Sequence, residues 1–381
     1  MSATPRATLS RTDVVRIVLG WVAFVALLLV RPVLGPSAPA PVLIAALAVI
    51  VAVIVVCAFG VVVQAEALAR RLGDPHGSLV LTLSIVLIEV VLISAVMLGP
   101  GSHETIARDS VMAVSMIILN LVIGIALLVG GIRRGGMAHN RTGTSMYLAM
   151  LVVLLSVALA LPALIGEGGA YTLGQAVIVI VLTLGLYAFF LFRQTGAQAS
   201  DFIEVGRQSE HRELSETRDA AVSVLATVRA HGTEIVTRLV VLLLTVVPIV
   251  LLSHDMASLL DDGLERLNAP RALAGVLIAA IVFLPESITA VRAAHGGEVQ
   301  RTINLCHGAL VSTVGLTVPA VLVIGSLTGQ RVLLAETPAE QLLLGATLLL
   351  SITTFAAKRV TAIHGAAHLA VFAVYLLVLI G

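Results

Sequence analysis

Apolar runs long enough to cross a lipid bilayer recur along the whole chain, and they constrain the fold more than any other feature. Hydrophobic residues make up 59% of the 381 positions and charged residues only 12%. Soluble domains average roughly 45–50% apolar and about 25% charged residues. A run of about 20 apolar residues is enough to cross a hydrocarbon core about 30 Å thick. The composition therefore excludes an ordinary soluble globular protein.

These runs predict an all-α polytopic membrane protein with about eleven transmembrane helices. The predicted spans are 14–34, 42–65, 77–98, 106–131, 145–165, 171–193, 235–254, 271–292, 300–327, 339–356 and 361–380. Helices are required because lipid cannot satisfy exposed backbone groups, and the continuous runs differ from the short alternating segments of a membrane barrel. The first run resembles a secretory signal, but it continues to Leu34 and a second span begins near Val42, which favours a transmembrane helix.

The distribution of positive charge predicts the orientation. With the N-terminus in the cytoplasm, most Arg and Lys residues fall on the cytoplasmic side, as the positive-inside rule requires. An odd number of spans then places the C-terminus outside. The net charge of +1 gives no indication of a nucleic-acid partner. Cys57 and Cys306 both lie inside apolar runs, which argues against a disulfide framework or a cysteine zinc site.

A single polar stretch, residues 194–233, divides the chain. It is too short for a domain of ordinary size, so we expect a solvated cytoplasmic linker, with a cation-sensing or docking element as the alternative. The predicted organisation is an N-terminal region with the first span (1–41), a five-helix half (42–193), the linker, and a second five-helix half (234–381). An odd number of spans per half gives the halves opposite topology, so we predict inverted repeats.

Two acidic residues, Glu89 and Glu286, lie deep inside predicted spans, each in the second helix of its half. A charged residue at mid-membrane costs roughly 2.5–3.5 kcal/mol on insertion scales and is a functional candidate by default. The alternative is a protonated or hydrogen-bonded structural carboxyl. Pro285 directly precedes Glu286 and leaves a backbone carbonyl one turn earlier without its helical donor. Broken helices place such carbonyls beside transported ions.

Each of these helices is followed by one that carries polar residues. The candidate supporting residues are Ser115 and Asn120 in the span 106–131, and Asn304, His307, Ser312 and Thr313 in the span 300–327. Small residues beside them also suit close helix packing, but a buried amide needs hydrogen-bond partners. His364 and His368, spaced four apart, could bind zinc, although a packing or hydrogen-bonding role is favoured because no carboxylate or cysteine lies close in sequence.

Two carboxylates at one depth predict a cation/proton antiporter rather than an enzyme. Deprotonated, Glu89 and Glu286 offer two charges and up to four oxygens, and calcium prefers six to eight oxygen ligands. Protonated, they are neutral and can cross the dry midplane without a metal ion. The metal is therefore the transported substrate, and no cofactor is expected. The sequence contains no Walker lysine motif, so it gives no support for ATP-driven pumping.

Several segments resemble a known family. FLPESITAVRAAHGGEVQRTINLCHGALVSTVGLTVPAVL and LVLTLSIVLIEVVLISAVML are similar to the bacterial ChaA-type calcium/proton antiporters of the cation/calcium exchanger superfamily. The resemblance runs from about residue 64 to residue 380. It implies a multi-pass protein of the bacterial cytoplasmic (inner) membrane, with ten of eleven helices in two inverted repeats. It also implies that Glu89 and Glu286 bind the cation and carry the protons, that Asn120 matches an asparagine of the family pattern, and that Ser312 stands where many calcium/proton exchangers have glutamine.

The sequence departs from that pattern beside both glutamates. The superfamily often has Gly-Asn-Ala-x-Glu, whereas here Ile85-Val86-Leu87-Ile88 precedes Glu89 and Val282-Phe283-Leu284-Pro285 precedes Glu286. Two potential oxygen ligands are missing, so the ion is less constrained than the reaction, and the leading prediction is proton-coupled cation export with calcium ahead of sodium or potassium. A sodium or potassium/proton antiporter is therefore the first alternative. A channel or a structural membrane protein is a more distant one, because no filter loop or pore helix is evident. The oligomeric state is not predicted.

Overall fold

The fold is helical and polytopic, as the sequence predicts. The computed structural model describes residues 10–34, 38–72, 104–205, 224–267, 269–270 and 272–380, with isolated positions between 86 and 97. Among these residues, nine helices are long and apolar enough to cross a membrane, or ten if the bent pair Leu273–Val282 and Leu284–Gly296 is one span. The predicted span 77–98, which carries Glu89, lies mostly outside the described residues. The total of eleven spans therefore stays a prediction.

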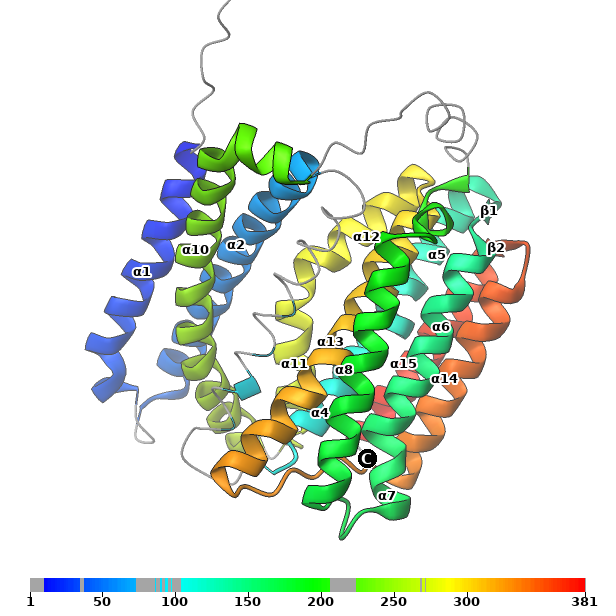
Figure 1. Ribbon diagram of the computed structural model, residues 1–381. Coiled ribbons are helices and arrows are strands. Elements are labelled where there is room, and N and C mark those ends of the chain that lie inside the picture. The colour runs from blue at the N-terminus through cyan, green and yellow to red at the C-terminus, as the bar shows by residue number, and fades with distance from the viewer. Residues whose placement is uncertain are drawn as a thin grey trace, which may run out of the picture. The chain divides into compact units, whose positions relative to one another are not determined.

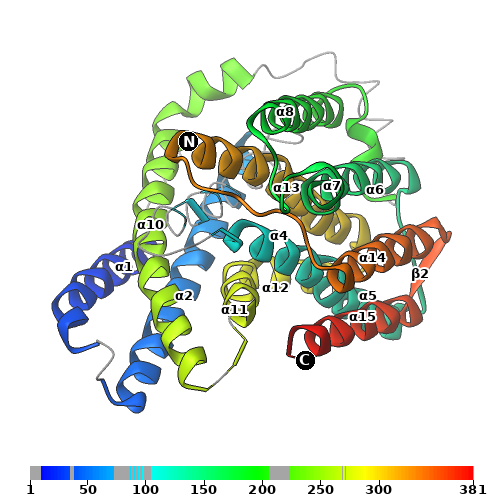
Figure 2. The same ribbon diagram turned by 90° about the horizontal axis from the view of Figure 1, so that it is seen from below.

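The chain divides into two compact units, of which the smaller is a three-helix unit. It contains α1 (Arg11–Val30), the short 3₁₀ turn η1 (Arg31–Val33), α2 (Ala40–Leu72) and α10 (Val224–Arg266). The three helices lie side by side in both views (Figures 1 and 2). Helix α10 extends well beyond the predicted span 235–254 at both ends, with a non-helical residue, His231, near its start.

Polar contacts tie the helices of the three-helix unit together near both ends. Arg31 donates two hydrogen bonds of 2.9 Å to the carboxylate of Asp255. At the opposite end, Arg238 donates to Gln64 Oε1 at 3.2 Å. The unit combines α2 and α10, which are the first helices of the two predicted halves. The linker between those halves is described only up to residue 205 and from residue 224.

The large unit contains all other described elements. In chain order they are α4 (Ile106–Met116), η2 (Ile117–Val122), α5 (Ile123–Arg134), β1 (Gly136–Ala138), α6 (Arg141–Leu155), η3 (Ser156–Ala160), α7 (Leu161–Ile165), α8 (Leu173–Thr195), η4 (Ala199–Phe202), α11 (Ala272–Val282), α12 (Leu284–Gly296), α13 (Val299–Thr328), α14 (Pro338–Ala356), β2 (Arg359–Thr361) and α15 (Ala362–Ile380). Elements η2 and η3 are single π-helical turns inside continuous spans. Such turns often occur at functional sites.

Two helical spans form the enclosed centre of the large unit. Within an 18-residue apolar stretch of each span, 83% of the residues are buried in α4–η2–α5 and 67% in α13, but only 17% in α15. Helix α5 packs against α15, the last helix of the second predicted half, and α13 packs against α8, the last helix of the first (Figure 2). This reciprocal pairing is the arrangement that two inverted repeats would produce, although the internal repeat itself stays a prediction.

The loops of the large unit gather at two opposite ends. Strand β1 pairs antiparallel with β2, with Gly136 opposite Thr361. We call this the sheet end (residues 135–140, 296–298 and 357–361). At the other end Ala170 forms a bridge with Leu333, whose N–H also donates to Glu104 O at 2.9 Å. We call this the bridge end (residues 104–105, 166–172 and 329–337). Each end collects loops that the arginine pattern assigns to one side of the membrane.

Helices α5 and α15 approach closely at glycines. A Cβ added at Gly365 would lie 2.5 Å from the backbone N of Leu128, and one added at Gly131 would overlap the backbone N of Ala362. We predict that Gly365→Ala lowers the free energy of unfolding by about 1–3 kcal/mol, since backbone atoms cannot rotate away from the new methyl group. Thermal unfolding in detergent checks this. Gly345→Ala in α14, where a Cβ meets nothing within 4 Å, is the control, and equal melting temperatures for the two variants would contradict the prediction.

Candidate functional site

A broken span in the large unit carries Glu286. Helices α11 and α12 meet at Phe283 with a bend of 60°, and the backbone angles of Phe283 (φ −87°, ψ 1°) lie outside the helical range. Pro285 explains the break locally, because its ring disfavours a continuous helix and its nitrogen cannot donate a hydrogen bond. The N–H and the hydroxyl of Ser287 both donate to Phe283 O, at 2.9 and 2.7 Å, and so start the new helix.

The break places Glu286 in the first turn of α12. The amino-terminal end of a helix carries a partial positive charge, which favours a negative group there. The side chain is partly buried. Its Oε2 atom is buried and has no hydrogen-bond partner among the described residues. An oxygen in that position can accept a proton or contribute to the coordination of a cation.

Glu89, the second predicted carboxylate, lies outside the described residues, so the pairing of the two glutamates stays a prediction. The other predicted site residues all lie in the large unit, on elements that pack around the broken span. Helix α4 and η2 pack against α11, and α13 packs against α12. Ser115 lies on α4, Asn120 on η2, and Asn304, His307, Ser312 and Thr313 on α13.

Asn120 is the centre of a buried hydrogen-bond network. Its Nδ2 donates to Thr347 Oγ1 at 2.8 Å, and its Oδ1 lies 3.2 Å from His368 Nδ1. The other ring nitrogen, His368 Nε2, lies 3.2 Å from the hydroxyl of Thr354. An Nδ1–H tautomer of His368 satisfies both contacts, donating to Asn120 and accepting from Thr354. The amide therefore directs its polar atoms toward α14 and α15.

The same network settles the role of the two spaced histidines. His368 has the hydrogen-bonding role that the sequence favoured, and His364 Nδ1 accepts a hydrogen bond from the backbone N–H of Thr361 at 3.0 Å. Among the described residues, no group of three or more His, Cys, Asp or Glu side chains is arranged to hold a metal ion. That search does not include Glu89.

The polar stripe of α13 makes contacts in several directions. Ser312 Oγ accepts a hydrogen bond of 2.9 Å from the hydroxyl of Tyr187 on α8. A Cβ at Gly315 would lie 3.0 Å from the Tyr187 ring, so that glycine makes room for the tyrosine. Asn304 Nδ2 donates to Phe202 O at 2.6 Å and holds the segment that follows α8. These contacts show that part of the stripe joins α13 to α8 and η4.

The remaining predicted residues are enclosed. The ring of His307 stacks on Tyr147, with centroids 6.1 Å apart, and its Nδ1 bonds to Ile303 O at 3.3 Å. Its Nε2 is buried without a hydrogen-bond partner among the described residues. Ser115 donates within its own helix, to Val111 O at 2.7 Å. Thr313 is fully buried.

Two tyrosines and a threonine complete these contacts, and the sequence analysis missed them. Tyr147 and Tyr187 are two of only four tyrosines in the chain, and both lie within apolar spans. A tyrosine hydroxyl usually finds a partner when buried. Gln194 Nε2 donates to the Tyr147 hydroxyl at 2.6 Å. The position of these tyrosines in apolar runs could have indicated buried hydrogen bonds. Nothing in the sequence distinguishes Thr347 from the other helical threonines.

Comparisons with known proteins agree with this architecture. A family model described as sodium/calcium exchanger protein matches residues 42–196 and 237–381. The chain is 33% identical over 343 residues to the sodium-potassium/proton antiporter ChaA of Escherichia coli (strain K12), covering 90% of this chain and 91% of that protein. It is also 33% identical over 322 residues to the putative ionic transporter y4hA of Sinorhizobium fredii (strain NBRC 101917 / NGR234), covering 84% of each.

Solved structures share the fold at low sequence identity. The structure of native YfkE matches with a TM-score of 0.69 and 16% identity, covering 96% of this chain and 99% of that chain. The H⁺/Ca²⁺ exchanger CAX matches with a TM-score of 0.68 and 14% identity, covering 96% of this chain and 89% of that chain. These likenesses show that the chain shares the fold of these proteins over nearly its whole length.

The Asn120 network gives a matched pair of threonine substitutions. Thr347→Val removes the acceptor of a buried amide donor, and leaving a buried donor without its partner costs about 1–3 kcal/mol. Thr353 on the same helix is exposed, and we expect Thr353→Val to change stability by no more than about 0.5 kcal/mol. Thermal unfolding of the two variants in detergent compares them directly. If Thr347→Val were as stable as Thr353→Val, the network would not contribute to holding η2 against α14.

Proposed function

From the premise that the chain belongs to the sodium/calcium exchanger family and is a cation antiporter, we propose that it exchanges calcium for protons through Glu286 and Glu89. The resulting activity is cation export from the cytoplasm by alternating access. The family is one of secondary transporters, so the ion gradient rather than a covalent reaction drives the cycle.

The observation that carries the proposal is the position of Glu286. Its carboxyl group lies in the first turn of a half-helix inside a membrane span, and Oε2 is buried without a hydrogen-bond partner among the described residues. An isolated carboxylate in an apolar interior is costly unless a cation or a proton balances its charge. If the carboxyl group always holds either a proton or a cation, binding of one ion requires release of the other. The movements of the two ions are thereby coupled.

The break supplies further oxygen. Pro285 has no N–H, so the carbonyl of Ile281 cannot receive the hydrogen bond that a continuous helix would provide. In transporters with discontinuous helices, such carbonyls help to coordinate the transported cation. Glu89 would supply the second carboxylate from the corresponding helix of the first half. Exchange would then require both acids to be free of protons when the cation is bound.

Two carboxylates favour a divalent ion, because calcium is bound by several oxygens and by negative charge. A second candidate is exchange of sodium or potassium for protons. It is favoured by the name of the ChaA relative, a sodium-potassium/proton antiporter at 33% identity. The absence of both pattern asparagines beside the glutamates points the same way, since it removes two neutral oxygens. Both candidates use the same site.

The orientation is part of the proposal. The arginine distribution puts the N-terminus and the sheet end of the large unit in the cytoplasm. The bridge end and the C-terminus then lie outside. For a bacterial chain this means the cytoplasmic membrane, with the cation released at the bridge end.

Transport in everted membrane vesicles tests the proposal. We expect wild-type vesicles to release protons when calcium is added, with sodium and potassium supplied separately for comparison. Glu286→Gln and Glu89→Gln should reduce this release to the level of vesicles without the protein, because a neutral amide can neither bind a proton nor balance a cation. The readout is cation-evoked proton release across a pH series.

The control variant is Glu298→Gln. Glu298 lies at the amino-terminal end of α13 and forms a partly exposed ion pair with Arg301 at 3.0 Å. The Glu298→Gln variant should leave cation-evoked proton release unchanged. Full exchange by either mid-membrane variant, or a proton signal that no cation evokes, would overturn the proposed function.

A further inference from the structure

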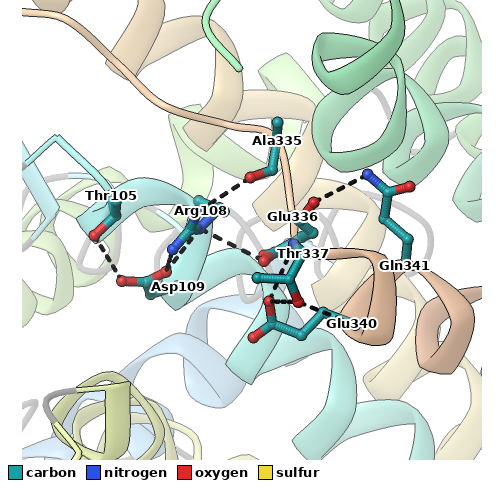
Figure 3. Close-up of polar contacts among 8 residues, drawn as sticks. All are labelled: Thr105, Arg108, Asp109, Ala335, Glu336, Thr337, Glu340 and Gln341. Atoms are coloured by element: carbon teal, nitrogen blue, oxygen red, sulfur yellow. Dashed lines mark hydrogen bonds and ion pairs between the residues drawn. The ribbon is translucent and has the colours of Figure 1, made fainter. Parts of the chain in front are cut away.

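Four charged side chains that the proposed site does not use lie together at the bridge end of the large unit (Figure 3). Arg108 and Asp109 belong to the first helical turns of α4, Glu336 to the loop before α14, and Glu340 to the first turn of α14. Three carboxyl groups therefore surround one guanidinium. We call these four residues the bridge-end cluster.

The charge of Arg108 is committed mainly to Asp109. Arg108 Nε and Nη2 both lie 2.9 Å from Asp109 Oδ1, and Nη1 donates to Ala335 O at 3.1 Å. Thr105 Oγ1 donates to the other Asp109 oxygen at 2.8 Å. Asp109 therefore accepts several hydrogen bonds. Because Arg108 is paired with Asp109, little of its positive charge remains to stabilise ionised Glu336 and Glu340.

Glu340 also has donors that stabilise its ionised form. Thr337 Oγ1 donates to Glu340 Oε2 at 2.7 Å, and the Thr337 N–H donates to the same oxygen at 3.3 Å. This is the capping box at the start of α14, where the helix dipole adds to the stabilisation. Glu340 therefore provides a fixed negative charge.

Glu336 differs from its neighbours. Its side chain is 1% exposed and points into the cluster, with Oε2 lying 3.5 Å from Arg108 Nε. Neither carboxyl oxygen accepts a hydrogen bond from a donor group among the described residues. Its backbone is held in place, since its N–H donates to Leu159 O at 3.2 Å and its carbonyl accepts from Gln341 Nε2 at 3.1 Å. A buried acid in a fixed position without donors favours its protonated form.

Most of the surrounding charges also favour the protonated form of Glu336. Burial, the hydrogen bond and charge of Glu340 and the charge of Asp109 together raise the pKa of Glu336 to about 9, and only Arg108 opposes them. From α15, Tyr375 interacts electrostatically with the same three acids. At neutral pH the Glu336 carboxyl group therefore holds a proton, which it can share with the Glu340 carboxylate.

We propose that Glu336 is a second proton-binding site of this antiporter, separate from Glu286 and located at the bridge end of the large unit. The ligand is a proton rather than a metal ion, since one Glu336 oxygen already lies 3.5 Å from Arg108 Nε and the described residues include no group of three or more His, Cys, Asp or Glu side chains arranged to hold a metal ion. The binding step is reversible addition of one proton to the Glu336 carboxylate. Its role in exchange rests on the proposed function, whereas the proton binding itself does not.

The cluster lies at one end of the helices that carry the proposed cation site. The backbone of Asp109 lies 3.8 Å from the position of a Cβ at Gly275 of α11. From Gly275, α11 runs to the break at Phe283 before Glu286, a distance of about 12 Å at 1.5 Å for each residue of helix. Proton loss from Glu336 adds an uncompensated negative charge beside α4 and α11. Its occupancy is therefore expected to change how exchange depends on the pH at the bridge end.

Infrared titration of the purified full-length protein tests the proton directly. We expect a protonated carboxyl band that persists at neutral pH and disappears near pH 9. This component should be missing in Glu336→Gln and present in Glu336→Asp. Glu167→Gln, which changes an exposed glutamate at the same end, should leave the spectrum unchanged. An identical band in wild type and Glu336→Gln would overturn the proposal.

Stability gives an independent readout. An unfolded glutamate ionises near its ordinary pKa of 4.5, whereas folded Glu336 stays protonated up to about pH 9. The folded state then binds more protons between these values, so stability falls as the pH rises across that window. Glu336→Gln should have the higher melting temperature at pH 8 and a flatter dependence on pH. Parallel melting curves for wild type and variant across this window would contradict the assignment.

Vesicle transport separates this site from the proposed function. Glu336→Gln should retain exchange but shift its dependence on the pH at the bridge end, whereas Glu167→Gln should not shift it. If Glu336→Gln lost the infrared band but did not shift the pH dependence of transport, Glu336 would bind a proton without a role in exchange. Conversely, if Glu286→Gln kept full exchange while the Glu336 component was present, the proposed function would fail and the proton site would stand.

Discussion

A carboxyl group in the interior of a bilayer needs a proton or a cation to balance its charge, and the proposed account depends on this constraint. The structure meets it by interrupting a span at Phe283, so that Glu286 begins a new half-helix. The helix terminus favours the charged form, and the unpartnered Oε2 leaves room for a ligand. A continuous helix would instead have saturated the backbone groups around the acid and left the charge unsupported.

The elements around the break are held by buried polar contacts that join distant parts of the chain. Asn120 ties η2 to α14 and α15, and the Tyr187 hydroxyl ties α8 to Ser312 of α13. Each contact replaces a hydrogen bond that lipid could not provide, so each also fixes which helices are neighbours. Glu336 shows a different case, since it is equally enclosed but its oxygens accept no hydrogen bond from a donor among the described residues, and its contact with Arg108 Nε at 3.5 Å is shared with Asp109. A proton on that carboxyl group makes its burial tolerable.

Local sequence predicts some of these features and cannot predict others. The helical spans follow from hydropathy because a bilayer permits little else, and the break follows from Pro285. The partners of Asn120 could not be predicted, since Thr347 and His368 are more than 200 residues away and resemble other polar residues of their helices. Glu336 lies between the predicted spans 300–327 and 339–356, and nothing in its local sequence indicates that its side chain is buried. Its contacts with Leu159 and Arg108 join it to segments more than 170 residues away in sequence. The extra length of α10 was also missed, because its ends are polar while its centre alone is apolar.

The most direct test of the central claim is the number of protons released when a cation binds to purified protein in weakly buffered detergent solution. The account predicts that calcium, or the alternative monovalent ion, displaces protons from wild type, that its apparent affinity rises with pH, and that Glu286→Gln releases fewer protons. Cation binding at unchanged affinity across the pH range, without proton release, would contradict the claim that one carboxylate site holds either ion in turn.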